Sequence, residues 1–381
     1  MQAVKKHHSL HLPHGHEITS FIKKNLVTLI AMSAAIITCF FVPVDRAYLD
    51  YFDYKTLVCL FCVLAVVCAL KNVRFFYILA QRIVSVFKTA RSSVLALVYV
   101  TFIGSMLIAN DMALLTFLPL GYFVLSTTGK KKYMAFTFIM QNIAANLGGM
   151  LTPFGNPQNL YLYTKFDIPT AEFMGIMAVP FVLSIALITA CCIIFVRPEK
   201  LSLPEEKVAL NAKRTIIYLA LFALSIVIVF KVIHYLIGLA VILLALLFLD
   251  RKALRSVDYG LLFTFVFFFI FSGNMSRISA VRQIFSNLLE KNTLLVSALS
   301  CQVISNVPSA ILLSQFTENY RQLLLGVNIG GVGTIISSLA SLITLREFTT
   351  QGGGSVKKYI LLFSAFNFAF LIILLIVCSL I

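Results

Sequence analysis

Apolar stretches follow one another along almost the whole chain, from Asn25 to Ile381. Most are roughly 15 to 25 residues long, which matches the length an α-helix needs to cross the hydrocarbon core of a bilayer. The strands of a membrane barrel would show shorter segments of alternating polarity. The pattern therefore predicts an all-α integral membrane protein. Continuous spans are expected near residues 25–43, 56–70, 172–196, 215–230, 232–249, 259–272 and 357–381.

Two further crossings are interrupted. Segments 133–165 and 321–346 are long enough to span, but each carries glycines and polar residues in its middle. Irregular backbone is tolerated at membrane depth only where protein or a wet cavity satisfies its N–H and C=O groups. We therefore expect about nine transmembrane helices, two of them broken.

Two other apolar stretches, 92–127 and 293–319, are interpreted as re-entrant hairpins that enter and leave on one side of the membrane. Each follows a charged, amphipathic segment (71–91 and 274–292) typical of a helix lying on the membrane surface. The polar residues at their centres are Asn110 and Asp111 in the first, and Ser305, Asn306 and Pro308 in the second.

Composition supports the membrane interpretation. Hydrophobic residues make up 60% of the chain and charged residues 12%, far too apolar a mixture for a water-soluble protein of 381 residues. A net charge of +16 would suggest nucleic acid in a soluble protein. Here Lys and Arg lie between the apolar segments, so membrane topology explains them and no nucleic-acid partner is expected.

The distribution of positive charge also predicts the orientation. If the polar tail 1–24 is cytoplasmic, about three-quarters of the 31 Lys and Arg residues fall on cytoplasmic segments. The first apolar run is long and follows Lys23 and Lys24, so it is expected to be a first span and not a cleaved signal peptide. We expect a multi-pass protein of the cell membrane with its N-terminus in the cytoplasm and its C-terminus outside.

Residues 25–196 and 232–381 resemble each other, and the linker 197–231 between them holds one span. The single span would invert the second half relative to the first, as in transporters built from inverted repeats. IANDMALLTFLPL (108–120) corresponds to ISNVPSAILLSQF (304–316), and NLGGMLTPFGNPQN (146–159) corresponds to NIGGVGTIISSLAS (328–341).

The hairpin centres and helix breaks are the candidate binding site. A broken helix exposes N–H groups, which favour anions, and carbonyl groups, which favour cations. Asn and Thr oxygens suit Na⁺ or hydrogen bonds to an oxyanion, although small polar residues also pack membrane helices together. The candidate residues are Asn110, Asp111, Asn146, Thr152, Gly155, Asn156, Asn159, Ser305, Asn306, Asn328, Thr334, Ser337 and Ser338.

Asp111 is the one acidic residue placed deep in an apolar segment, where an unpaired carboxylate costs several kcal/mol unless it is protonated, hydrated or bound to a cation. We expect it to take part in ion coupling, with Asn110 and Asn156 as further Na⁺ ligands and no other cofactor. A structural alternative is that Asp111 caps the second hairpin arm by accepting from the N–H of Ala113 or Leu114. The two roles are compatible.

The phrases NDMALLTFLP, NLGGMLTPFGNPQN, SNVPSAILL and NIGGVGTIISSLASLI are similar to signature segments of the ion transporter superfamily. The resemblance is strongest to arsenite-permease and sodium/proton-antiporter-like permeases, with citrate and divalent-anion/sodium symporters as relatives. It covers nearly the whole chain after the N-terminal tail. It implies a homodimer with a scaffold domain and a mobile transport domain, and an elevator mechanism.

The hairpin tips depart from the symporter relatives, in which a Ser-Asn-Thr triplet at each tip binds sodium and the substrate carboxylate. The resemblance puts 109–111 (Ala-Asn-Asp) and 305–307 (Ser-Asn-Val) at these positions, so only Asn is kept in both. This difference argues against a dicarboxylate. The Asn-Asp pair and the segment 337–340 (SSLA) resemble the arsenite-permease-like branch instead.

Taken together, these features predict an ion-coupled (Na⁺ or H⁺) secondary transporter of a small anion, oxyanion or carboxylate. The alternative is a Na⁺/H⁺ antiporter in which Asp111 carries the ions and the substrate is a cation. An enzyme would need a Ser/His, paired-Asp or HExxH arrangement at membrane depth, and the sequence contains none. A channel would need a continuous pore instead of inverted hairpins.

Overall fold

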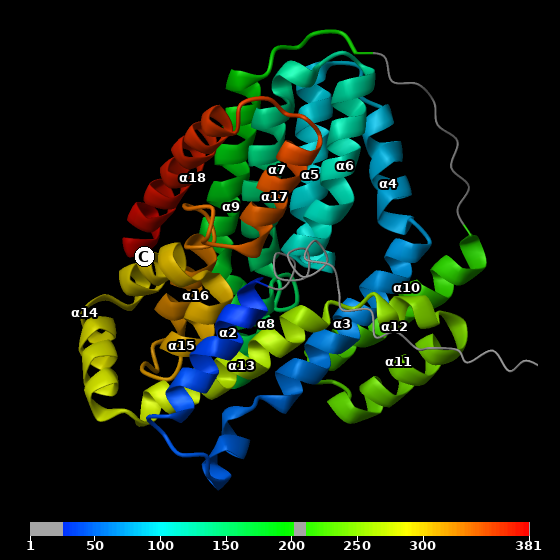
Figure 1. Cartoon of the computed structure of the whole chain (residues 1–381). Coiled ribbons are helices and arrows are strands. Elements are labelled where there is room, and N and C mark those ends of the chain that lie inside the picture. The colour runs from blue at the N-terminus through cyan, green and yellow to red at the C-terminus, as the bar shows by residue number, and fades with distance from the viewer. Residues whose placement is uncertain (1–25, 202–210, 381) are drawn as a thin grey trace, which may run out of the picture.

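The computed structural model describes residues 26–201 and 211–380, and all regular secondary structure in these stretches is helical (Figure 1). The all-α expectation is confirmed. The expected cytoplasmic tail, residues 1–24, lies outside the described residues.

One set of helices occupies the lower half of Figure 1, and we call it the α3 group. Within it, α2 packs along α13, and α3 packs against both α10 and α11. The group consists of α2 (Leu26–Cys39), α3 (Tyr54–Asn72), α10 (Ala212–Val229), α11 (Tyr235–Leu249), α12 (Arg251–Arg255) and α13 (Tyr259–Arg277), with the 3₁₀-helix η1 (Arg46–Tyr51).

The remaining helices form the α7 group. Helices α5, α6, α7, α9, α17 and α18 stand side by side in the upper half of Figure 1, and α8, α14, α15 and α16 continue below them. Helix α4 (Phe75–Ser85) packs against α3, α5 and α6, between the two groups. The bounds are α5 (Ala90–Ile108), α6 (Asn110–Thr127), η2 (Lys131–Tyr133), α7 (Met134–Gly148), η3 (Gly149–Leu151), α8 (Pro157–Lys165), α9 (Thr170–Phe195), α14 (Ser279–Ile304), α15 (Asn306–Leu313), α16 (Tyr320–Ile329), α17 (Leu339–Thr350) and α18 (Val356–Ser379).

Polar residues between the apolar runs fix where helices begin. The Asp53 carboxylate accepts a bond from the N–H of Thr56 at 2.9 Å and starts α3, and Asp258 accepts from Leu261 at 3.0 Å and starts α13. Thr89 forms a capping box at the start of α5. Such caps satisfy N–H groups that have no partner within the helix, so each apolar run enters its helix at a defined residue.

Six helices in the described part of the chain are long and apolar enough to cross a membrane: α3, α5, α9, α10, α13 and α18. Helices α2, α4 and α11 are apolar but shorter. The sequence predicts about nine spans. It does not count α5, which it assigns to a re-entrant hairpin, but it counts α2 and α11 and treats 133–165 and 321–346 as single crossings. In the structure these segments are divided into α7 with α8 and α16 with α17, and no piece reaches the length of a span.

Large apolar side chains cover much of the outer surface. Ile194 is 72% exposed, Val303 is 73% exposed and Leu361 is 74% exposed. Such a surface would be unstable in water but is compatible with lipid chains. The chain is therefore a multi-pass membrane protein.

Helix α14 contains a kink at Asn292, whose backbone is extended (φ −164°, ψ 90°). The Asn292 side chain accepts a bond from the N–H of Leu295 at 2.8 Å, as a helix cap does. The kink lies at the boundary between the amphipathic segment 274–292 and the hairpin 293–319 that the sequence predicts.

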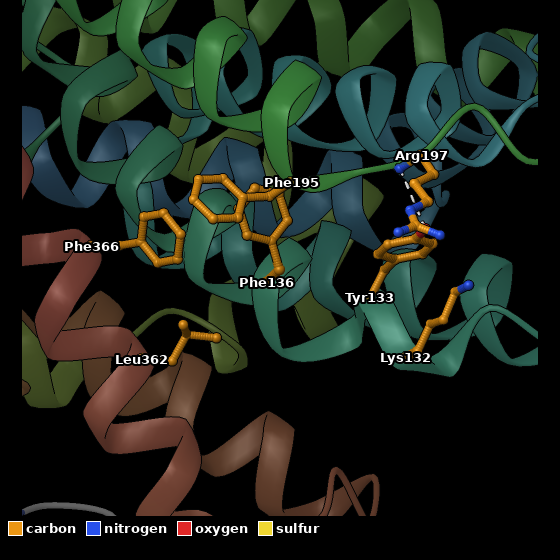
Figure 2. Close-up of a pocket in the computed structure, with 7 residues that line it drawn as sticks. All are labelled: Lys132, Tyr133, Phe136, Phe195, Arg197, Leu362 and Phe366. Carbon is orange, nitrogen blue, oxygen red and sulfur yellow. Dashed lines mark hydrogen bonds between the residues drawn. The ribbon is translucent and has the colours of Figure 1, made fainter.

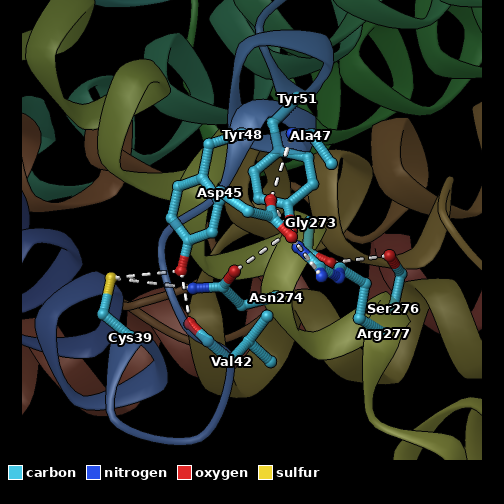
Figure 3. Close-up of polar contacts among 10 residues, drawn as sticks. All are labelled: Cys39, Val42, Asp45, Ala47, Tyr48, Tyr51, Gly273, Asn274, Ser276 and Arg277. Carbon is cyan, nitrogen blue, oxygen red and sulfur yellow. Dashed lines mark hydrogen bonds and ion pairs between the residues drawn. The ribbon is translucent and has the colours of Figure 1, made fainter.

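A polar cluster fixes η1 on the end of α13 (Figure 3). The Arg277 guanidinium donates two bonds to the Asp45 carboxylate, at 3.0 and 2.6 Å, and the Tyr51 hydroxyl donates to Asn274 Oδ1 at 3.2 Å. The Tyr51 ring packs where a Cβ at Gly273 would lie only 2.4 Å away, so this position requires glycine. Because the ion pair between Arg277 and Asp45 is partly exposed, it contributes at most about 1 kcal/mol to this junction.

A short extended segment, residues 197–201, follows α9, and we call it the strap. Its Glu199 carbonyl accepts from the N–H of Ala90 at 2.7 Å, and its Leu201 N–H donates to the Lys88 carbonyl at 2.9 Å. The Glu199 carboxylate also binds Lys130 at 2.6 Å. The strap thus holds together the beginning of α5 and the loop after α6, which are the two ends of the first hairpin.

Hydrogen bonds from Lys130, Lys132 and Tyr133 lower the pKa of the Glu199 carboxyl to about 2. A carboxyl with a lowered pKa stabilises the fold above its ordinary pKa, and this stability is lost as the pH falls through the lowered value. We predict that Glu199→Gln lowers the melting temperature by the same amount at pH 7.5 and pH 5.5, and by less at pH 3.5.

The measurement is thermal unfolding of the detergent-purified chain at the three pH values. Glu290→Gln, which changes an exposed glutamate outside the strap, is the matched control and should leave the melting temperature unchanged. Equal melting temperatures for the wild type and Glu199→Gln at pH 7.5 would contradict the assignment of Glu199 as the residue that holds the hairpin ends.

Candidate functional site

The two hairpins turn through the same unusual backbone conformation. The residues between their arms, Ala109 (φ 65°, ψ 152°) and Ser305 (φ 75°, ψ 159°), both have positive φ without being glycine. In each turn the next residue is asparagine, and its Oδ1 accepts from the following N–H at 2.9 Å: Asn110 from Asp111, and Asn306 from Val307. Such local bonds favour Asn at this position.

The breaks in the two interrupted segments are anchored to the first arms of the hairpins. Thr152 Oγ1 donates to the Met106 carbonyl at 2.8 Å, and Thr334 Oγ1 donates to the Gln302 carbonyl at 3.0 Å. Both threonines, expected among the ligands, therefore use their hydroxyl protons within the protein. They hold each break against its own hairpin.

Glycines allow this close contact. A Cβ at Gly148 would lie 2.2 Å from the Phe102 carbonyl oxygen, and one at Gly330 would lie 2.9 Å from the Ala298 carbonyl oxygen. Gly155, an expected site residue, has a similar role: its Cβ would lie 2.3 Å from the carbonyl oxygen of Gly149 within the break. These glycines shape the site by bringing backbone close to backbone.

A cluster of buried asparagines lies where the hairpin tips meet the breaks. Asn110 Nδ2 donates to Asn146 Oδ1 at 3.2 Å. Asn328 Nδ2 donates to Asn159 Oδ1 at 2.6 Å, and Asn156 Nδ2 donates to the Asn146 carbonyl at 3.2 Å. All five are at most 3% exposed.

The second tip joins the same cluster. A Cβ at Gly331 would lie 3.2 Å from Asn306 Nδ2 and 3.4 Å from Asn146 Oδ1, so Gly331 lies beside amides of both halves. The Asn306 N–H donates to the Ser337 carbonyl at 2.9 Å. The structure therefore brings together, from four separate segments, all six asparagines that the sequence predicts as site residues.

The three expected serines differ in their contacts. Ser305 Oγ donates to the Ser337 carbonyl at 3.3 Å, and Ser337 Oγ bonds the Gly331 carbonyl at 2.9 Å. Both hydroxyls are therefore occupied by the break. Ser338 is 1% exposed, and its Oγ has no hydrogen-bond partner among the described residues.

Three of the predicted site residues have a buried side-chain oxygen without a partner in the described part of the chain: Asp111 Oδ1, Asn156 Oδ1 and Ser338 Oγ. Asn156 and Ser338 precede α8 and α17, and they occupy corresponding positions in the two matched sequence segments. A buried oxygen without a partner costs about 1–3 kcal/mol. These oxygens can therefore accept a bond from a ligand or coordinate a cation.

The structural alternative had the Asp111 side chain accept a bond from the N–H of Ala113 or Leu114. For Ala113 this is wrong, because its N–H donates to the Ala109 carbonyl at 2.9 Å. Asp111 lies in the first turn of α6, where the positive end of the helix dipole stabilises a carboxylate.

Sequence reasoning missed Gln302. Its Nε2 donates to the carbonyls of Gly330 (2.9 Å) and Val332 (3.2 Å), and its Oε1 accepts from the Thr334 N–H at 2.8 Å. One side chain therefore satisfies three backbone groups of the second break. A polar residue in an apolar hairpin arm, four positions before Asn306, was the available signal.

A second buried polar group, next to the asparagine cluster, was also missed. Asn142 lies one turn before Asn146 in α7; its Nδ2 approaches Asn367 Oδ1 at 3.4 Å, and its Oδ1 is 3.4 Å from Thr344 Oγ1. These contacts link α7 to α17 and α18. Asn367 is the only asparagine in the last apolar run, a signal that sequence analysis could have used.

Residues 18–321, most of the chain, match the CitMHS family, described as citrate transporters. The chain belongs to this family. This membership confirms the resemblance to the ion transporter superfamily that the sequence motifs indicated. Citrate symporters are among the relatives named there. The family's description indicates a transporter.

Two relatives are similar to this chain over most of its length. An uncharacterized transporter of Methanocaldococcus jannaschii is 33% identical over 316 residues, which cover 81% of this chain and 85% of the relative. The inner membrane protein YbiR of Escherichia coli is 30% identical over 326 residues, covering 81% of this chain and 83% of the relative.

The threonine anchors of this CitMHS protein can be tested as a pair. Thr152→Val and Thr334→Val keep the shape of the side chain but remove the bond to the hairpin carbonyl, so each should cost about 1 kcal/mol of unfolding free energy. The measurement is the loss of melting temperature in detergent.

Thr137→Val is the matched control, since Thr137 is buried and its hydroxyl has no partner among the described residues. It should be neutral or slightly stabilising. A loss in Thr137→Val equal to that in the two anchors would mean that the hydrogen bonds are not the cause.

Proposed function

We propose that this CitMHS-family protein is an ion-coupled secondary transporter that carries a small anion, oxyanion or carboxylate across the cell membrane. The observation that carries the proposal is the meeting of both hairpin tips with both helix breaks in one buried asparagine cluster. Helices α6, α15, α8 and α17 all begin at these tips and breaks. Their N-terminal N–H groups favour an anion.

The lack of cationic side chains in the hairpin tips and helix breaks also supports coupling to a cation. Segments 108–120, 146–159, 304–316 and 328–341 contain no Lys or Arg. A helix N-terminus stabilises an anion by up to about 2 kcal/mol in partly buried geometry, much less than a full opposite charge nearby, so an anion gains from a co-bound cation. The oxygens of Asn110, Asp111 and Asn156 are the proposed ligands for that cation, Na⁺ in the first instance.

An inverted repeat with an elevator mechanism completes the proposal. Three matched features support the repeat: the tip conformations at Ala109 and Ser305, the glycine contacts in each break, and the bonds of Thr152 and Thr334 to the hairpin arms. We propose that the α3 group is the scaffold and that the α7 group carries the substrate. In this proposal the chain is a homodimer with its N-terminus in the cytoplasm and its C-terminus outside.

The contacts between the two groups suit relative movement. Helix α13 packs against α15, and α3 packs against α8. At this junction the Tyr161 ring of α8 lies 5.5 Å from the Phe269 ring of α13, centroid to centroid. The Tyr161 hydroxyl bonds Ser314 at 2.9 Å, inside the α7 group. Ring contacts of this kind would let one group slide past the other. The exposed ion pair between Lys231, after α10, and Asp167, after α8, also links the two groups and would have to break or move with them.

A Na⁺/H⁺ antiporter is the second candidate function. Asp111 Oδ1, which has no hydrogen-bond partner among residues 26–201 and 211–380, favours it. Proteoliposomes separate the two candidates. We expect Na⁺ uptake that requires an added anion, with citrate tested first because the family description names it, followed by other carboxylates and oxyanions. Na⁺-driven proton efflux without any anion would overturn the proposal and establish the antiporter.

Asp111→Asn tests the coupling site. The substitution removes the charge but keeps the size, so we predict loss of ion-coupled transport with normal membrane insertion and an unchanged elution profile in size-exclusion chromatography. Asp53→Asn is the control, because its Oδ1 caps α3 and asparagine also caps helices; it should retain transport. Wild-type dependence on the ion gradient in Asp111→Asn would remove Asp111 from the mechanism.

A further inference from the structure

A cavity of about 360 Å³ lies where α7, α9 and α18 meet, away from the asparagine cluster (Figure 2). Phe136, Phe195 and Phe366 form a triangle of rings on one side of it. Their centroids are 5.7, 5.5 and 5.1 Å apart. Phe195 is 54% exposed, so the ring cluster opens onto the outer surface of the protein.

The other side of the cavity is cationic. Figure 2 shows Lys132 and Arg197 near the Tyr133 ring, apart from the phenylalanines. The Arg197 N–H donates to the Tyr133 hydroxyl at 3.3 Å, which fixes the beginning of the strap beside the cavity.

The charges at this site do not balance. Glu199 supplies one carboxylate to both Lys130 and Lys132. Within residues 26–201 and 211–380, no carboxylate lies within ion-pair distance of the Arg197 guanidinium. The cavity therefore has an excess of positive charge and favours an anion.

The cavity lies at the boundary between apolar and polar surface. At the end of α9 the exposed residues Ile194 and Phe195 are followed within two positions by Arg197. Such a change marks the level of the lipid head groups, where Arg and Lys reach phosphates and aromatic rings contact acyl chains. A ligand that fills this cavity must have both an anionic and an apolar part.

We propose that the cavity binds an anionic phospholipid of the surrounding bilayer. Its phosphate lies between Lys132 and Arg197, and an acyl chain lies over Phe136, Phe195 and Phe366. Basic pockets between membrane helices are a known means of binding acidic head groups, and each nearby cation contributes about 1 kcal/mol. A zwitterionic lipid would lack the net charge, and a soluble phosphate would lack the chain.

The lipid would link distant parts of the chain. Phe136 and Phe195 come from the first half, on α7 and α9, and Phe366 comes from α18 near the C-terminus. The strap beside the head group holds both ends of the first hairpin through Glu199. A bound lipid would therefore stabilise the α7 group at this end, independently of which solute is transported.

The test compares phosphatidylglycerol and phosphatidylcholine with identical acyl chains, added to the delipidated full-length chain. We expect phosphatidylglycerol to raise the melting temperature and to form one retained adduct in native mass spectrometry. The apparent affinity should fall about fivefold in Arg197→Gln, and about twenty-five-fold when Lys132→Gln is added. Phe195→Ala should also weaken binding.

Lys252→Gln with Arg255→Gln is the matched control, because it removes the same pair of charges from exposed positions on α12. It should bind phosphatidylglycerol as the wild type does. Equal stabilisation by phosphatidylcholine, or wild-type affinity in the Lys132/Arg197 double variant, would overturn the proposal. Stabilisation by glycerol 3-phosphate equal to that by the lipid would also overturn it, since it would indicate a site for soluble anions.

Discussion

The structure depends on one constraint: backbone that leaves the helical conformation in apolar surroundings must find its hydrogen bonds within the protein. Both breaks meet this requirement in the same way. A threonine of each break donates to a carbonyl of the neighbouring hairpin arm, Thr152 to Met106 and Thr334 to Gln302. The Asn159 side chain donates to the carbonyls of Gly149 and Met150, both at 3.2 Å, and supports the first break from within.

The same constraint explains why the candidate site consists of amides. Asparagine both donates and accepts, so one residue type can bond backbone groups and other asparagines in a buried cluster. Asn156 Oδ1 and Ser338 Oγ have no partner among the described residues, because the other groups of the cluster bond one another. In the proposed function, specificity would come from these remaining acceptors and from helix ends, because the matched segments contain no Lys or Arg.

The ends of the helices follow simpler rules. Short-range caps such as Asp53 and Asp258 start helices of the α3 group, and the strap closes the first hairpin with a carboxylate that two lysines and a tyrosine bind. These contacts lie in or near loops, where water and lipid head groups compete with them. The caps and the strap set where whole helices lie. The buried amides bond individual carbonyl groups of the breaks and so fix their backbone conformation.

Much of this protein could be predicted from its sequence. The length of the apolar runs determined the all-helical membrane fold, and the motifs around Asn110 and Asn306 determined the family, because both depend on short-range patterns. Glycines and asparagines inside apolar runs also located the candidate site, since few other residues tolerate broken backbone there.

Only the tertiary structure decided which atoms of these residues are free. The hydroxyl protons of Thr152 and Thr334, both predicted site residues, bond the hairpin arms, and the side chain of Gln302, which the sequence did not single out, closes the second break. The set of helices long enough to span also differs from the expected set, in part because the breaks divide two expected crossings into short pieces. The physical reason is that a polar group bonds whichever partner the fold brings close to it. Partners nearly 50 residues apart, such as Thr152 and Met106, cannot be paired from their spacing in the sequence.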